Sequence, residues 1–136
     1  MVVTTERRFI PVDNLLPGNR LDTLVAVSFM HWRYMSVPAG KVSAVEWGEW
    51  VDNRGHTQYA GGDGGFHPST DDQSAMRIVD HWADSRQGDF RMQLTNGIWT
   101  VTFFRPSEEY IATSGNRQVT ICRAALRSAG ITQIPA

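Results

Sequence analysis

The sequence predicts an α+β domain in which three helices pack with a mainly antiparallel sheet of about four strands, arranged as two hairpins. Three segments place apolar residues at helical spacing, and two pairs of strand-like runs are joined by turns that contain glycine. These elements follow the order helix, hairpin, helix, hairpin, helix, which is typical of the α+β class. Because the chain has 136 residues and no linker-like stretch, we expect a single domain over residues 1–136.

The first helix is expected in the segment PGNRLDTLVAVSFMHW. Asn19 can act as its N-cap, with Asp22 at the third helical position, as in a capping box. Apolar residues then recur at helical spacing and predict a face directed to the core: Leu21, Leu24, Val25, Phe29 and Trp32. Before this helix, the run RRFIPV is a candidate for an additional N-terminal strand.

The first hairpin is expected in the segment SAVEWGEWVDNRGHTQYA. Its side chains alternate between two faces, with Val45, Trp47 and Val51 on one face and Glu46 and Trp50 on the other. The DNRG that follows is predicted to form the turn, because Gly55 can adopt a positive φ angle there.

The second helix follows the stretch GGDGGFHPSTDD at residues 61–72. Ser69 is the predicted N-cap and Asp72 stands at the capping-box position. The helix is expected to end near Ser85. Apolar residues three, four and seven positions after Ala75 predict its buried face: Ala75, Ile78, Val79 and Trp82.

The segment DFRMQLTNGIWTVTFF predicts the second hairpin. Asn96 and Gly97 favour a two-residue turn, and closing the hairpin there fixes the pairs Leu94–Trp99, Met92–Val101 and Phe90–Phe103 on one apolar face. The opposite face is predicted to be polar, with Arg91, Gln93, Thr100 and Thr102. We therefore expect helices to cover one side of this hairpin only.

The last helix is expected in SGNRQVTICRAALRSAG, where Val119, Cys122 and Leu126 form one stripe and Gly130 ends the helix. Cys122 is the single cysteine of the chain, which excludes an internal disulfide. Its position in the apolar stripe favours a buried structural role, with a reactive thiol as the alternative.

No catalytic, metal or cofactor motif is recognisable in the sequence. The glycines of residues 61–65 do not satisfy G-x-G-x-x-G, and no Walker-type lysine is present. His67 and Asp71 lack a metal-ligand spacing, and no serine or cysteine has an identifiable base. We therefore expect a protein that is not an enzyme and binds no cofactor or metal.

The charge pattern suggests one anion-binding segment. The net charge of −1 argues against general nucleic-acid binding, although twelve of the thirteen basic residues are arginine. Asp71 and Asp72 would repel a phosphate from the second helix start. The third helix start has no acidic residue, so the predicted anion contacts are Ser114, Gly115, Asn116 and Arg117. Ordinary capping by Ser114 or Asn116 is the alternative.

Aromatic and small residues near the glycine loop form the second part of the predicted ligand site. They would stack on a base or approach a ribose closely: Trp50, Tyr59, Gly65, Phe66, Ser69 and Thr70. The alternative is that the loop only starts a helix. Trp32, Arg33 and Tyr34 are open to the same two interpretations, as a stacking site or as a protein interface.

Five motifs of the chain, taken in order, resemble the phage ABA sandwich domain family. They are the L-D-x-L-V-A start at residues 21–26, the D-x-x-G turn at 52–55, the PSTD helix start at 68–71, the G-x-W of the hairpin at 97–99 and the ICxAAL helix at 121–126. The resemblance spans residues 17–130. The AGGDGG insertion and the SGNRQ approach to the last helix depart from the family pattern.

The resemblance implies a phage-encoded intracellular protein. The sequence shows no signal-peptide pattern and no apolar stretch long enough to span a bilayer, so we expect the protein in the host cytoplasm. We expect a binding protein, in effect a sponge, that sequesters a nucleotide-derived host immune signal of the cyclic-nucleotide or ADP-ribose type. We also expect a homo-oligomer. The alternative is an accessory protein that acts through self-association or a host-protein partner without a small ligand. A hydrolase of such signals has no supporting motif.

Overall fold

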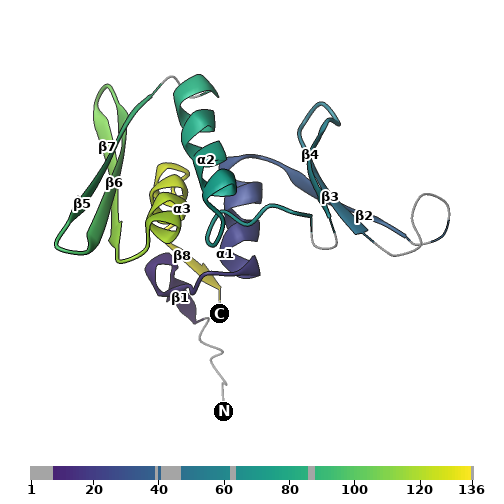
Figure 1. The fold of residues 1–136 in the computed structure, drawn as a ribbon, viewed down its shortest axis with the longest axis horizontal. Helices are drawn as coiled ribbons and strands as arrows, with labels where there is room; N and C mark the ends of the chain where they lie inside the picture. The colour runs from purple at the N-terminus through teal and green to yellow at the C-terminus, as the bar shows by residue number, and fades with distance from the viewer. Residues whose placement is uncertain (1–7, 39, 41–46, 62–63, 86–87, 136) are drawn as a thin grey trace, which may run out of the picture.

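The computed structural model describes residues 8–38, 40, 47–61, 64–85 and 88–135. Within this part of the chain the α+β class is confirmed, with three α-helices and eight strands in antiparallel sheets. Figure 1 shows the helices between two three-stranded sheets. A short third sheet pairs the first described strand with the last.

Helix α1 spans Asn19–Leu24, α2 spans Asp72–Ser85 and α3 spans Arg117–Ser128. A 3-10 turn, η1, covers Val12–Asn14, and a π-helical turn, η2, continues α1 over Val25–Phe29. The strands are β1 Phe9–Pro11, β2 Arg33–Val37, β3 Trp47–Val51, β4 Thr57–Gly61, β5 Asp89–Thr95, β6 Ile98–Arg105, β7 Glu108–Ser114 and β8 Gln133–Pro135.

The strands are more numerous than the sequence predicts, and they do not form one sheet. Each predicted hairpin gains a third strand, giving the sheets β2–β3–β4 and β5–β6–β7. The candidate N-terminal strand is confirmed over Phe9–Pro11, where it pairs with β8. The added strands were missed because β2 directly follows a helix and β7 follows Pro106–Ser107, a pair that is not typical of hairpin turns. Val45 and Glu46 lie outside the described residues.

Two helix starts differ from the predicted ones. Gly18 is the N-cap of α1, and Asn19 is its first helical residue. For α2, the carboxylate of Asp71 accepts a hydrogen bond of 2.9 Å from the Ser74 N–H, immediately before the helix begins at Asp72. Asp71, and not Ser69, therefore caps the N-terminus of α2, because its side chain directly precedes the helix and can accept from an N–H group of the first turn.

The predicted register of the second hairpin is confirmed in full. Leu94 pairs with Trp99, Met92 with Val101 and Phe90 with Phe103. Asn96 and Gly97 both have positive φ angles, 51° and 77°, as a two-residue turn of this kind requires.

The main core lies where α2, α3 and η2 meet the inner face of β5–β6–β7. Trp82 of α2 is fully buried, stacks on Phe103 with ring centroids 5.0 Å apart, and donates its indole N–H to the carbonyl of Asp89. Cys122 is also fully buried, and burial raises the pKa of its thiol well above the ordinary value. These two residues have the structural roles predicted for them.

The sheet β2–β3–β4 extends from the helices on the opposite side (Figure 1). Its turn at residues 52–55 is confirmed, with Gly55 at a φ of 83°. Between β3 and β4 the pairing shifts, so that Trp50 faces Tyr59, Val51 faces Thr57, and Gln58 has no partner on β3. This β-bulge turns the Gln58 side chain out of the regular ladder.

Candidate functional site

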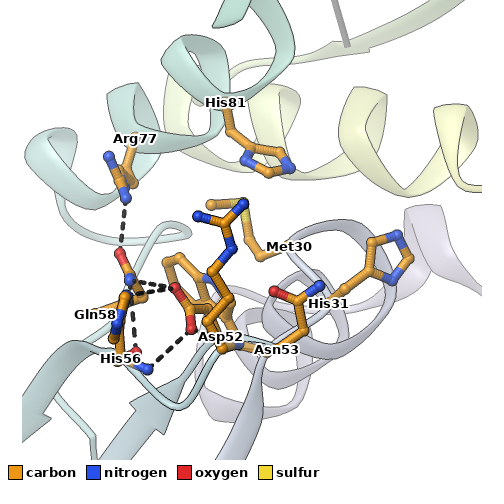
Figure 2. A pocket seen from close by; sticks show the side chains of 10 residues that line it. Met30, His31, Asp52, Asn53, His56, Gln58, Arg77 and His81 are labelled. Atoms are coloured by element: carbon orange, nitrogen blue, oxygen red, sulfur yellow. Dashed lines mark hydrogen bonds and ion pairs between the residues drawn. The ribbon is translucent and has the colours of Figure 1, made fainter. Parts of the chain in front are cut away.

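A cleft of about 530 Å³ lies between α2, the end of η2 and the turn that joins β3 to β4 (Figure 2). Most of its lining side chains are polar or charged: Met30, His31, Trp32, Asp52, Asn53, Arg54, His56, Gln58, Arg77 and His81. Three segments far apart in the sequence therefore contribute to one concave surface, which is the usual form of a small-molecule site.

Asp52 holds the β3–β4 turn in shape. One of its carboxylate oxygens accepts hydrogen bonds of 2.9 Å from the N–H groups of both Arg54 and His56, and the other accepts one of 3.0 Å from the amide of Gln58. The backbone hydrogen bond from His56 is the main reason that the pKa of Asp52 is lowered, and burial opposes it. The carboxylate is therefore ionised at neutral pH and engaged by the turn.

Gln58 connects this turn to α2. Its side-chain carbonyl accepts a hydrogen bond of 2.8 Å from the Arg77 guanidinium, while its amide donates to Asp52 (Figure 2). The bulge at Gln58 makes this possible, because a residue in the regular ladder would direct its side chain to one face of the sheet. Arg77 is consequently held at the wall of the cleft.

Arg54 is the second guanidinium of the cleft, and it is exposed. Its backbone N–H bonds to Asp52, but no described residue forms a hydrogen bond or ion pair with its guanidinium. A guanidinium that is free at the mouth of a cleft offers five donors in a planar fork to an incoming carboxylate or phosphate.

Three histidines also line the cleft. His31 follows the C-cap of η2 and has the left-handed conformation, with a φ of 59°. His81 packs edge-on against Phe29 at 5.4 Å, and His56 lies 3.9 Å from an oxygen of Asp52. Among the described residues, no group of histidine, cysteine and acidic side chains has a metal-binding arrangement. With two arginines beside them, the histidines instead add donors to a site suited to anions.

The residues predicted at the start of α3 lie together, and they bond mainly to one another and to α2. Asn116 is the N-cap and accepts from the Val119 N–H at 3.0 Å, which confirms the capping alternative for this residue. Ser114 shares a hydrogen bond of 2.6 Å with Thr120, and Gly115 separates it from the cap. Arg117 forms an ion pair of 2.7 Å with Asp72 and lies over the ring of Trp99.

The first turn of α3 contains no acidic residue, but Asp72 of α2 places a negative charge beside it. Asp72 comes from the first turn of α2 and also accepts a hydrogen bond of 2.9 Å from Gln118. An anion that bound here would have to share Arg117 with this carboxylate.

The predicted aromatic residues lie in a cluster beside the cleft. Trp50 and Phe66 are buried, and Tyr59 packs against Phe66 with ring centroids 5.0 Å apart. Trp32 joins this cluster at 4.9 Å from Phe66 and is the member that also lines the cleft. The aromatic residues of this cluster pack against one another, and Trp50, Tyr59 and Phe66 do not line the cleft.

The remaining predicted residues shape the loop before α2. Ser69 is fully buried, accepts a hydrogen bond from the Gly18 N–H at 2.9 Å, and donates its own N–H to Asp22 at 2.8 Å. Gly65 has a φ of 74° beside the Ala60 carbonyl. Thr70 is exposed in a turn that bonds back to His67.

None of the ten predicted ligand-binding residues lines the cleft. Arg54, Arg77 and the three histidines were missed as site residues because they are scattered over the chain between residues 31 and 81. The one available signal was the DNRGH sequence, where a turn carries an arginine and a histidine together.

Comparisons with known protein families, curated proteins and solved structures give no match to this chain. The resemblance to the phage ABA sandwich domain family stays a prediction. None of the described helices is long and apolar enough to cross a membrane.

Proposed function

We propose that this protein is a binding protein, and not an enzyme, that holds a small anionic molecule in the cleft between α2 and the β3–β4 turn. The observation that carries the proposal is the meeting of Arg54 and Arg77, from separate elements, at one cleft of about 530 Å³. Among the described lining residues, two guanidinium groups and one engaged carboxylate leave a positive surface, which attracts phosphates and carboxylates.

The chemistry of the lining favours binding over catalysis. Among the described residues, the cleft has no serine, threonine or cysteine that could act as a nucleophile. Asp52, the one acidic residue among the described lining residues, already accepts three hydrogen bonds and is poorly placed to act as a base.

A nucleotide-derived ligand fits the mixture of groups. The arginines would contact its phosphate, Asn53 and the imidazoles could bond to ribose or base atoms, and Trp32 and Met30 supply apolar surface. The resemblance to the phage family supports the further proposal that the ligand is a host immune signal of the cyclic-nucleotide or ADP-ribose type. In that role the protein would sequester the signal in the host cytoplasm.

The test is isothermal titration with inorganic phosphate, AMP, 3′,5′-cyclic AMP and ADP-ribose, with adenosine as the uncharged control. We expect heat from phosphate-bearing ligands, little from adenosine, and weaker binding at high salt. Denaturing the loaded protein should release the ligand unchanged, whereas a cleaved product would overturn the proposal that the protein is not an enzyme.

Three arginine variants locate the site. Arg54→Gln should weaken binding about tenfold or more, equivalent to about 1.4 kcal/mol, because it removes a charged donor without disturbing a bond. Arg33→Gln, an exposed position of β2 outside the cleft, should have no effect. If Arg117→Gln abolishes binding while Arg54→Gln does not, the ligand lies at the start of α3. No binding by any ligand would overturn the proposal.

A further inference from the structure

The outer edge of β5 is an unpaired strand edge that differs from the edge on the other side of its sheet. In the order β5–β6–β7, β6 is the only strand among the described residues that pairs with β5. At the other edge, β7 begins with Glu108 and Glu109, and its Thr113 carbonyl accepts a hydrogen bond from Arg123 of α3. Charged residues and covering side chains protect a strand edge. β5 also has charged residues, Asp89 and Arg91, on its outer face. The β5 edge has no proline or bulge over its seven residues.

The backbone groups that point outward from β5 belong to three residues. The two-residue turn makes Thr95 and Ile98 a hydrogen-bonded pair, and such pairs alternate along an antiparallel ladder. Phe90, Met92 and Leu94 are then the residues whose N–H and C=O groups face away from β6. Among the described residues, none forms a hydrogen bond with these groups.

The same three residues carry the apolar side chains of β5. Phe90 is 40% and Leu94 is 55% exposed, although both lie on the inner face of the sheet. On that face Phe103, the partner of Phe90, and Val101, the partner of Met92, are fully buried, whereas Trp99, the partner of Leu94, is half-buried. The helices therefore cover the centre of the sheet and leave its edge open. An open apolar edge with free backbone donors and acceptors is suited to pairing with another strand.

We propose that the occupant of this edge is β5 of a second copy of the chain. In an antiparallel pairing about a two-fold axis at Met92, the outward-facing residues meet one another: Phe90 faces Leu94 of the second copy, Met92 faces its counterpart, and Leu94 faces Phe90. All three pairs are of the hydrogen-bonded kind, so every outward N–H and C=O is satisfied. The two sheets become one sheet of six strands.

The charges of β5 agree with this pairing. On the outer face, Arg91 of one copy lies opposite Gln93 of the other, and Asp89 lies opposite Thr95, so no like charges are directly paired. Arg91 also lies over the ring of Phe104, with its guanidinium carbon 5.5 Å from the ring centroid, away from the edge. On the inner face, the half-exposed Phe90 and Leu94 become covered.

The association is tested by sedimentation velocity over a wide range of protein concentration. We expect a reversible monomer–dimer equilibrium. Leu94→Lys should weaken it about tenfold or more, because it would bury two ammonium groups in place of two leucines. Val27→Lys is the matched control, since Val27 is an apolar residue of similar exposure, 50%, on η2. Circular dichroism checks that both variants fold.

Two further measurements examine the register. Gln93→Glu should strengthen the dimer at low salt, because each new carboxylate faces an Arg91. Amide exchange measured by NMR should slow for Phe90, Met92 and Leu94 as the concentration rises, while the N–H groups of Arg91 and Gln93, already bonded to β6, should not change. A monomer at all concentrations, a dimer unaffected by Leu94→Lys, or unprotected amides at these three residues would overturn the proposal.

Discussion

The ring of Tyr34 lies across the backbone of Gly48 on the neighbouring strand, in the space that a side chain at residue 48 would occupy. From there it packs against Trp50, with ring centroids 5.2 Å apart, and approaches Gly64. Gly48 is thus the position that lets Tyr34 cover the buried Trp50 from the edge of the sheet.

Gly48→Ala should displace the Tyr34 ring. The side chain is flexible and 45% exposed, so it can swing outward, and the protein loses the aromatic contact, worth about 0.5–1.5 kcal/mol. Urea unfolding measures the loss. In a Tyr34→Ala background the same glycine substitution should cost almost nothing, and an equal cost in both backgrounds would contradict this interpretation.

Gly65→Ala should destabilise the protein by at least about 2 kcal/mol, because a methyl group there would lie 2.7 Å from the Ala60 carbonyl oxygen at a φ of 74°. Backbone atoms cannot move aside as a side chain can. Gly97→Ala is the matched control, since Gly97 has a φ of 77° but open space around it, so we expect a cost of about 1 kcal/mol. Equal losses in thermal unfolding would show that the contact with Ala60 is unimportant.

Asp22 is expected to make stability depend on pH in an unusual direction. Burial raises its pKa above 3.8, and the hydrogen bonds from Ser69 and the nearby His67 only partly oppose this. The folded protein therefore keeps the Asp22 proton at pH values where the unfolded chain has lost it. The contribution of this group to stability rises as the pH falls from above the folded pKa towards 3.8.

Asp22→Asn removes this titration while keeping an oxygen that can accept the Ser69 N–H. Relative to the wild type, the variant should be most favoured at neutral pH, and the difference in free energy of unfolding should decrease as the pH falls. Denaturant unfolding at several pH values tests this, with Asp80→Asn, an exposed position on α2, as the control. A difference that grows on acidification would contradict the expectation.

The parts of the fold that the sequence predicted well are those that local chemistry specifies. Asn96–Gly97 fixed the register of β5 and β6, because a two-residue turn leaves one way to pair the flanking strands. The apolar spacing of Leu21, Val25 and Phe29 likewise identified a buried helix face, although the backbone there widens into a π-helical turn.

The cleft could not be predicted in this way, because it depends on tertiary contacts. His31, Arg54 and Arg77 belong to three segments, and no local pattern states that the end of η2, the β3–β4 turn and α2 meet. The ion pair between Asp72 and Arg117 was missed for the same reason, since it joins the starts of two helices 45 residues apart in the sequence.

The unpaired Gln58 gives the cleft a mechanical property. Its terminal amide bonds to Arg77 on the helix side and to Asp52 on the sheet side, so one side chain links α2 to the β3–β4 turn. A tilt of the β2–β3–β4 sheet relative to α2 must either carry the Arg77 side chain with it or break its hydrogen bond to Gln58, because Gln58 and Asp52 both belong to the sheet and its turn. The extra residue in the ladder thus ties the orientation of a whole sheet to the position of a single guanidinium group.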